Sequence, residues 1–317
     1  MAIFLNEEEV VRLLPISEAI ECLEEVFSQQ GQGAVRNYPR NRTQAGGMGV
    51  TMMVAVLGGS GFGGFKVMGG GYRSSMVTLY GEDPPKMLAM MESRELGQIR
   101  TGAATGLATK YMSREDSRTV GIVGTGHQAI SQLTAVCAVR PIEKVKAFSR
   151  NPERRQAFCS EMSAMLGIEV MPVESAQAAV VGTDVVIAIT NVQTLEPVIL
   201  GDWLEPGMHI NAAGANSLTR RELDNSAVTK SSVIVTDAID QAKIECADLV
   251  IPIDAGLLQW EGITELGQVV AGHTHGRGAP DDITLFESQG IGMEDVAVAA
   301  HIFAKATQEG TGITLPF

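Results

Sequence analysis

A glycine-containing turn near the middle of the chain constrains the fold more than any other segment. The β-branched run from Thr119 to Val123 ends in Gly124-x-Gly126-x-x-Ala129, and an apolar stretch with helical spacing follows. A dinucleotide pyrophosphate needs this order, because the glycines permit a tight turn and a close approach of the backbone, and the small third residue lets the helix pack on the sheet. A plain strand-turn-helix also carries glycines. The flanking strand and helix favour the nucleotide interpretation.

The composition argues against several classes of function. The formal net charge of −13 opposes binding to nucleic acid or to anionic lipid, although a local cluster of cations can still attract an anionic small molecule. The sequence contains no apolar run of about 18 residues that would span a membrane. The N-terminus lacks the pattern of a secretory signal, and the four cysteines are far apart. We therefore expect a cytoplasmic protein with reduced thiols and no metal site.

Strand-like and helix-like segments alternate from Ser117 onward. The expected strands are residues 119–123, 144–148, 169–172, 184–189, 208–213 and 233–236. Such alternation is typical of a parallel, doubly wound sheet. We therefore predict an α/β fold with a Rossmann-type domain over residues 116–292.

The first third of the chain has a different pattern. Helical spacing over residues 6–30 is interrupted at Pro15, and a further helix is expected at 99–111. Between them, antiparallel strands are expected at residues 50–57, 64–68, 76–80 and 86–91. A last helix, at about 293–307, is expected to return to this part. Residues 1–115 and 293–317 are thus predicted to form a discontinuous α+β substrate domain into which the Rossmann domain is inserted.

The residues after the second strand of the Rossmann domain bear on the choice of cofactor. An acidic residue there would bind the ribose hydroxyls of NAD and repel the extra phosphate of NADP. This chain instead has Ser149 followed by Arg150, which can donate to that phosphate and pair with it. NADP(H) is favoured. NAD(H) stays possible if Arg150 is only a solvated loop residue.

Three cationic residues are candidates for a substrate site. Lys66 is centred on an expected apolar strand, on the face opposite Phe65 and Val67, where it either faces a pocket or is exposed. Arg40 and Arg42 could each clamp a carboxylate, or could be surface charges. Hydride transfer needs a substrate carbon held against a nicotinamide and a proton-donating or electrostatic partner, which such cations can supply.

Several segments together resemble the ornithine cyclodeaminase/μ-crystallin family. They keep the order of the family and run nearly from end to end of the chain. They are Gly-Phe-Lys66-Val, Ile-Arg100-Thr-Gly-Ala-Ala, the turn around Gly124, His209 to Asn216 with Arg221-Glu-Leu-Asp, Asp237 to Lys243, and Ile283 to Gly290 with Glu294-Asp295. The family includes ornithine cyclodeaminases, some alanine dehydrogenases and reductases of cyclic or linear ketimines.

The resemblance implies specific roles. Lys66 corresponds to the substrate-site lysine, Arg42 (or its neighbour Arg40) to the carboxylate-binding arginine, and Arg100 to a residue that contacts the cofactor. The other implied cofactor positions are Gly124, Gly126, His127, Gln128, Ser149, Arg150, Thr190, Gly214 and Ser288. Family members are dimers through the first domain, so the resemblance implies a homodimer.

One position departs from the cyclodeaminases. They carry a proton-handling aspartate two residues after the glycine of an Asn-Ala-x-Gly turn, where this chain has Asn216. An amide cannot act as a general acid or base near neutral pH. Asn216 is a candidate catalytic residue, and it favours net hydride transfer with exchangeable NAD(P)H over deamination. The alternative is that Asn216 only stabilises the turn.

The predicted function is reduction of a small α-imino acid to the L-amino acid. The leading substrate is 1-pyrroline-2-carboxylate, followed by the imino forms of alanine or aspartate. Two alternatives stay open: an ornithine cyclodeaminase and a non-catalytic carrier of a small ligand. The loops at residues 69–75 and 256–262 are expected to set specificity, and Asp237 and Asp295 to be structural or to act behind the site.

Overall fold

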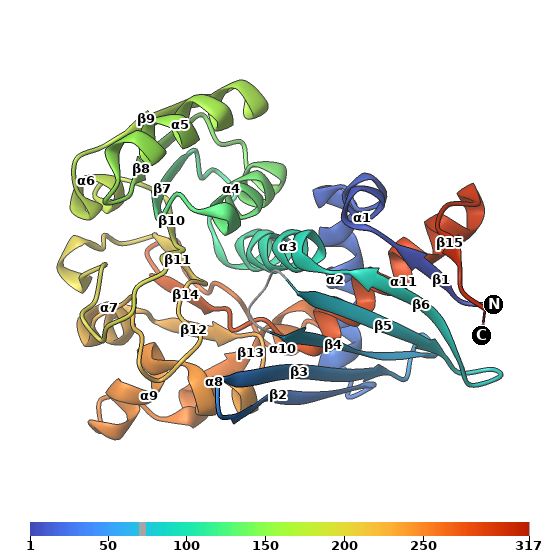
Figure 1. The fold of residues 1–317 in the computed structure, drawn as a ribbon. Coiled ribbons are helices and arrows are strands. Elements are labelled where there is room, and N and C mark those ends of the chain that lie inside the picture. Colours follow the sequence, from blue (N-terminus) through green and yellow to red (C-terminus); the bar gives the residue numbers. More distant parts are fainter. Residues whose placement is uncertain (70–73, 317) are drawn as a thin grey trace.

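Two β-sheets form the framework of the computed structural model, which describes residues 1–69 and 74–316 (Figure 1). Sheet A consists, in spatial order, of β15 (Ile313–Thr314), β1 (Ile3–Leu5), β6 (Lys86–Glu92), β5 (Ser75–Gly81), β4 (Phe62–Gly69), β3 (Met48–Leu57) and β2 (Val35–Ala45). Strand β1 is parallel to β6, and the other neighbours are antiparallel. The antiparallel sheet is confirmed. Strands β1, β2 and β15 were not predicted, because they are short or rich in polar residues.

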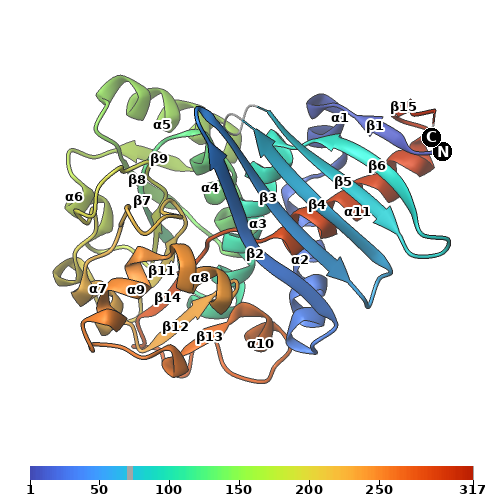
Figure 2. The same ribbon diagram turned by 60° about the horizontal axis from the view of Figure 1, so that its bottom comes forward.

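One face of sheet A packs on helices. Helix α11 (Gly292–Glu309) lies across β2 to β5, and α2 (Ile16–Gly31) packs beside it, so that both run behind the strands in Figure 2. Alternation along β3 explains this arrangement, because Met53, Ala55 and Leu57 are buried towards the helices while Met52 and Val56 face outwards. The last long helix thus returns to the first sheet, as expected.

Sheet B is wholly parallel. Its strands, in spatial order, are β13 (Ile263–Glu265), β12 (Val233–Thr236), β14 (Thr284–Glu287), β11 (His209–Ala212), β10 (Val185–Ala188), β7 (Thr119–Val123), β8 (Lys144–Phe148) and β9 (Glu169–Pro172). The six predicted strands are confirmed. Strand β14 lies between β11 and β12 although it comes later in the chain, an order that local sequence does not encode.

Both faces of sheet B are buried, which defines the doubly wound fold. The helices that follow its strands are α4 (His127–Val139), α5 (Pro152–Leu166), α6 (Ala176–Val180), α7 (Asn225–Lys230), α8 (Ile239–Glu245), α9 (Ala247–Asp254) and α10 (Leu266–Val270). Ile122 and Ile187 pack in one hydrophobic cluster with α4 and α5, whereas Val186 and Ala188 pack in another with α6 and α7. Strands buried on both faces require nearly continuous apolar runs, as in β7, β10 and β12, whereas β8 and β9 towards one edge are partly exposed and include charged residues.

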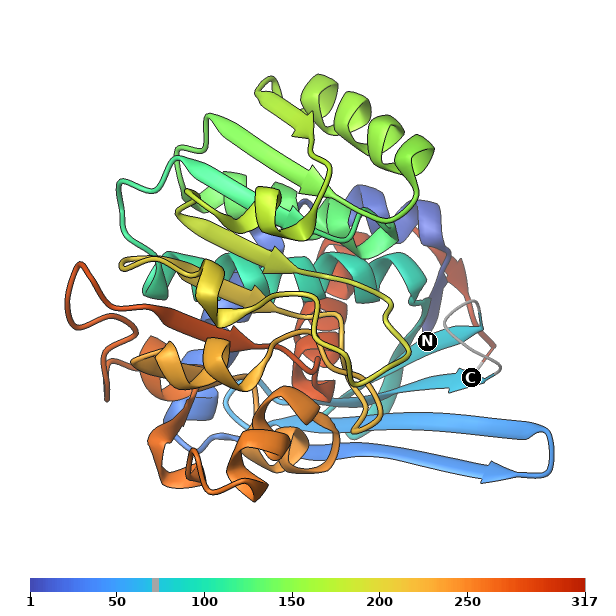
Figure 3. The ribbon, with the colours of Figure 1, turned by 90° about the vertical axis from the view of Figure 1, so that its left-hand side faces the viewer.

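Helix α3 (Arg94–Met112) joins the two sheets and lies between them (Figure 3). It packs closely on α4 because it is rich in small residues. A Cβ atom on Gly102 would lie 2.5 Å from the carbonyl of Ser131, and one on Gly106 would lie 2.9 Å from Cβ of Ala135. The close approach fixes α4, and the glycine turn that precedes it, against α3.

Local signals set several helix ends. Asn6 caps α1 (Glu7–Leu13) with a reciprocal bond to Glu9, and Asn151 caps α5 before Pro152. The structure reports no helix within residues 1–69 and 74–316 with the length and apolarity needed to cross a bilayer.

Candidate active site

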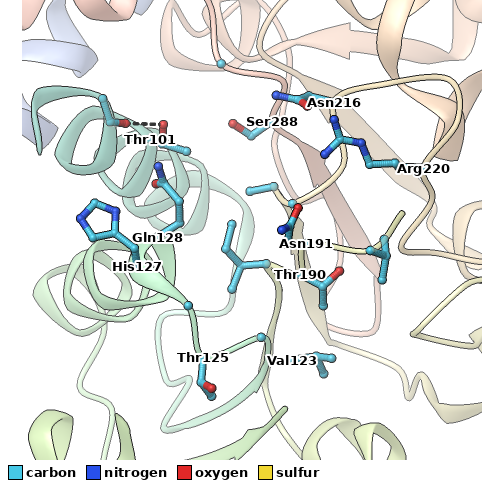
Figure 4. Close-up of a pocket in the computed structure, with 18 of the residues that line it drawn as sticks. Thr101, Val123, Thr125, His127, Gln128, Thr190, Asn191, Asn216, Arg220 and Ser288 are labelled. Carbon is cyan, nitrogen blue, oxygen red and sulfur yellow. Dashed lines mark hydrogen bonds between the residues drawn. The ribbon is translucent and has the colours of Figure 1, made fainter. Parts of the chain in front are cut away.

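A cavity of about 850 Å³ lies at the carboxyl ends of the sheet B strands, where they face α3 and sheet A (Figure 4). Segments that follow β7, β8, β10, β11 and β14 form one wall. Residues of β2, β3, β4 and α3 form the other wall. Ligands of open parallel sheets bind at this edge, so the cavity has the expected position.

The predicted nucleotide turn forms part of this wall. Gly124 has φ +111°, and a Cβ atom there would lie 2.1 Å from the carbonyl oxygen of Ile189, so only glycine fits. Gly126 precedes α4. Among the described residues no side chain caps that helix, and beyond the adjacent residues no atom lies within 4 Å of the place where a Cβ of Gly126 would be. Bare backbone and free N–H groups at a helix start suit a diphosphate.

Buried polar atoms of the same wall support a ligand there. Among the residues that the structure describes, Oε1 of Gln128 and Oγ of Ser288 have no hydrogen-bond partner. Both residues line the cavity. Buried polar groups are nearly always bonded, so these two atoms fit contacts to a bound molecule. His127 also lines the cavity, and its Nε2 lies 3.0 Å from Oε1 of Glu95.

The end of β8 carries positive charge. Thr125 Oγ1 donates to Ser149 Oγ at 2.7 Å. Arg150 and Arg154 line the cavity, and within the described ranges their guanidinium groups form no hydrogen bond or ion pair with protein. Arg155 differs, because it is buried and pairs with Glu174 at 2.9 Å. Two cations are therefore available to an anionic ligand at this end.

Lys66 is buried, so the alternative prediction, that its side chain is exposed on the strand, is wrong. Its side chain is 2% exposed, and Nζ lies 3.0 Å from Oδ1 of Asp295, in the first turn of α11. The same oxygen accepts from Nε of Arg100 at 3.1 Å, and Nη1 of Arg100 lies 2.7 Å from Oε2 of Glu294. Lys66 and Arg100 both line the cavity, and one carboxylate connects them.

The electrostatics of this network differ between its two acids. Burial opposes ionisation of Asp295, but Arg100 and Lys66 outweigh it and hold the pKa of Asp295 below its usual range. Burial raises the pKa of Glu294 to about 8 in spite of Arg100. Asp295 is therefore held ionised between two cations, whereas burial favours the neutral form of Glu294.

Arg40 and Arg42 occupy different environments. Arg40 is buried and lines the cavity, where Nη1 lies 2.5 Å from Oε1 of Glu245 and Nη2 donates at 2.8 Å to the carbonyls of Gln289 and Gly290. Arg42 is 44% exposed, binds the other oxygen of Glu245 and is not part of the lining. The structure thus brings Arg40, rather than Arg42, to the cavity with Lys66.

The segments after β10 and β11 complete the wall. Thr190, Gly214 and Asn216 line the cavity, as does Arg220, which the sequence analysis missed (Figure 4). The guanidinium of Arg220 is half-buried beside Asn216 and has no hydrogen bond or ion pair with any residue in the described ranges. A lone arginine in a polar loop carries no local signal, so only the fold reveals it.

Other expectations have mixed outcomes. Asp237 is a buried structural acid, because its Oδ2 accepts from the backbone N–H groups of Gln289 and Gly290 at 2.7 and 2.6 Å, and burial raises its pKa to about 6. Residues 70–73 of one expected specificity loop lie outside the described residues. None of residues 256–262, the other expected loop, lines the cavity.

Comparison with known proteins agrees with this architecture. The chain belongs to the ornithine cyclodeaminase/mu-crystallin family, whose model matches residues 1–310. It resembles the structure of Thermococcus litoralis Delta(1)-pyrroline-2-carboxylate reductase in complex with NADH and L-proline, with TM-score 0.93 and 34% identity over 99% of this chain and 100% of that one.

Two further solved structures are similar over almost the whole chain. An archaeal alanine dehydrogenase dimer with bound NAD has TM-score 0.91 and 30% identity, covering 100% of this chain and 99% of that one. The iminosuccinate reductase of Paracoccus denitrificans in complex with NAD⁺ has TM-score 0.91 and 26% identity, covering 99% of both chains.

Proposed function

We propose that this protein reduces a small α-imino acid to the corresponding L-amino acid with NAD(P)H. The observation that carries the proposal is the buried ammonium of Lys66 in the same cavity as the glycine turn before α4. A bound nicotinamide cofactor supplies the hydride. The protein has to hold the cofactor, hold the substrate carboxylate and stabilise charge at the C=N group.

The residues of the cavity divide these tasks. Gly124, Gly126 and the first turn of α4 receive the diphosphate. Arg40 attracts the substrate carboxylate, because its place on the wall favours it over Arg42, and Arg100 contacts the cofactor, as the family resemblance implies. Lys66 faces the imine side, where its ammonium can stabilise the developing amine or donate a proton to its nitrogen. Asp295 keeps that ammonium in place through the bond at 3.0 Å.

The cyclic imino acid 1-pyrroline-2-carboxylate is the leading substrate. It fits the apolar Met53 and Met68 beside Lys66 in the cavity wall. One observation favours a second candidate, a dicarboxylic imino acid such as iminosuccinate. Lys66, Arg40 and Arg100 each face a buried carboxylate, whereas Arg220 faces none among the described residues and could bind a second substrate carboxylate.

For the cofactor, the residues after β8 favour NADP(H) over NAD(H). Ser149 stands where an acid would repel the extra phosphate, and Arg150 and Arg154 offer cations without a protein partner in the described ranges. The related structures described above contain NADH or NAD⁺, so a comparison of NADPH with NADH is a direct test of this preference.

We propose a homodimer formed through the outer face of sheet A. The strand registers place Tyr38 opposite Val54, and Val54 opposite Phe65, on this face. Tyr38, Met52 and Val56 are between 42% and 64% exposed there. A contiguous apolar sheet face of this kind marks a protein–protein interface. The four cysteines are unpaired, which fits a reducing compartment such as the cytoplasm.

The experiment that tests the proposed function is a substrate panel. Oxidation of NADPH and NADH is followed with 1-pyrroline-2-carboxylate, with pyruvate plus ammonia and with oxaloacetate plus ammonia, and ornithine is supplied with NAD⁺ to test cyclodeamination. We expect reduction of at least one imino acid, and a severe loss of rate in Lys66→Ala with nearly unchanged NADPH binding. Proline and ammonia from ornithine would establish the lyase. Cofactor binding without turnover on any substrate would establish the carrier.

A further inference from the structure

A single buried carboxylate joins the two loops at the nicotinamide side of the cavity. Oε1 of Glu222 accepts from both N and Oγ1 of Thr190 at 2.6 Å, after strand β10. Oε2 accepts from N of Gly214 at 2.7 Å, after strand β11. Glu222 is fully buried, does not line the cavity and has no cationic partner in the described ranges.

The backbone around Glu222 ties the same segments together. Its carbonyl accepts from N of Val198 and Ile199 at 2.8 and 3.0 Å, where the loop after β10 ends. Its own N–H donates to Asp248, in α9, at 3.0 Å. The side chain therefore closes the loop of residues 214–222, which carries Asn216 and Arg220, and fastens it to the loop that begins at Thr190.

The backbone of Gly214 packs tightly against Glu222 and Thr190. A Cβ atom on Gly214 would lie 2.5 Å from Oε1 of Glu222 and 2.5 Å from both N and O of Thr190. Three backbone segments thus meet around one carboxylate. Burial raises the pKa of Glu222, while the convergent donors from Thr190, Gly214 and Ala215 act against that rise.

We propose that Glu222 is a positioning residue that sets the spacing of the Thr190 and Gly214 loops for the nicotinamide half of the cofactor. It also sets the hydrogen-bonding character of Thr190. Because the hydroxyl proton of Thr190 is donated to Glu222, only lone pairs of Oγ1 remain for the cavity. Thr190 then selects a donor from the cofactor, either the carboxamide N–H or a ribose hydroxyl. This inference rests on the proposed use of a pyridine nucleotide.

The main test is Glu222→Gln, which keeps the shape and presents an NH₂ group to at least one of the donors. Asp224→Asn is the matched control, because Asp224 caps α7 two residues away, contacts N of Gly201 and Ala227, and does not line the cavity. Two readouts are compared: the Kd for NADPH and NADH from fluorescence titration, and amide hydrogen exchange of residues 189–194 and 212–217 in the cofactor-free protein.

We expect Glu222→Gln to raise the cofactor Kd by about 10-fold to 100-fold, the loss of a hydrogen bond to a charged group. Exchange of both loops should accelerate together, while Asp224→Asn matches the wild type in both readouts. The KM for the imino acid should change less than the KM for the cofactor. A folded Glu222→Gln protein with wild-type exchange and a Kd within twofold of wild type overturns the inference.

If Glu222→Gln does not fold, the Thr190 hydroxyl provides the test. Thr190→Val keeps the backbone bond to Glu222 and removes the acceptor, so its cofactor Kd should rise about 10-fold. Thr190→Ser should restore it. Wild-type affinity in Thr190→Val contradicts the inference. Failure of the proposed function is distinguishable, because it shows as a wild-type protein that oxidises neither cofactor with any imino acid.

Discussion

Gly97 determines whether the ammonium of Lys66 can occupy its position. It lies on α3, and a Cβ atom built there would be 2.5 Å from Nζ of Lys66, whereas ordinary contact begins at 3.4 Å. Gly97→Ala would therefore push the ammonium away by about 1 Å. A shift of that size disturbs the 3.0 Å bond of Nζ to Asp295 and moves the ammonium relative to the substrate. The clash involves only the far end of a flexible side chain, so the fold can tolerate it.

The expected effect is large on catalysis and small on stability. Displacement of a reacting group by about 1 Å costs on the order of 100-fold in rate. Alanine is the better helix former by about 0.5–1 kcal/mol, so α3 itself is not weakened. We expect kcat/KM for the imino acid to fall about 100-fold, with the Kd for NADPH within about threefold of wild type.

A double-mutant cycle with Lys66→Met tests whether the loss of activity in Gly97→Ala comes from displacement of the ammonium. Without the ammonium, the added methyl group has nothing charged to displace, so Gly97→Ala in the Lys66→Met background should cost little more than Lys66→Met alone. Stopped-flow reduction and cofactor titration are measured for all four proteins. Full activity of Gly97→Ala would refute the reasoning. So would an undiminished loss in the Lys66→Met background, because the methyl group would then obstruct substrate or cofactor directly.

Three other predictions follow from the same structure. Val56→Asp, on the outer face of sheet A, should give a monomer by light scattering and leave the circular dichroism spectrum unchanged. The control Met165→Asp, at another exposed site, should stay dimeric, and a dimeric Val56→Asp would place the interface elsewhere. Arg150→Ala should raise the KM for NADPH about 10-fold and leave that for NADH nearly unchanged; equal changes would mean that Arg150 does not meet the extra phosphate. Burial lowers the pKa of His209 from 6.5 to about 3 in the folded protein. The unfolded chain therefore binds the proton at higher pH than the folded one, and the free energy of unfolding falls as the pH drops below 6.5. Between pH 6.5 and pH 5 the loss should be about 2 kcal/mol, and urea unfolding of His209→Gln should show a flatter profile; a profile identical to wild type would exclude His209 as the source.

Periodic and local features could be predicted well. Strands β7, β10 and β12 and the glycine turn before α4 are encoded by contiguous runs of β-branched and small residues, and β8, β9 and β11 by shorter segments that mix apolar and polar residues. The local pattern placed Lys66 on the face opposite Phe65 and Val67 but left open whether that face is buried, and the family resemblance supplied its expected role. Strands β13 and β14 were missed because they are short and follow irregular segments.

The partners of the site residues could not be predicted from spacing. A β-bulge between Tyr38 and Asn41 interrupts the alternation of β2, so the pattern could not decide which of Arg40 and Arg42 reaches the cavity. Arg220 and Glu222 lie in a polar loop with no periodicity. Their roles depend on β10 and β11 being neighbours in sheet B.

The sequence by itself determined the glycine turn before α4 and the change from antiparallel to parallel organisation, and it named Lys66 and the Arg40–Arg42 pair as candidate cations. These properties depend on residues within a few positions of one another, whose turn chemistry and periodicity are local. Only the tertiary structure decided that Asp295, 229 positions after Lys66, holds the ammonium and that Glu222 joins two loops. Such contacts form when distant segments pack together, and burial then sets both their geometry and their charge.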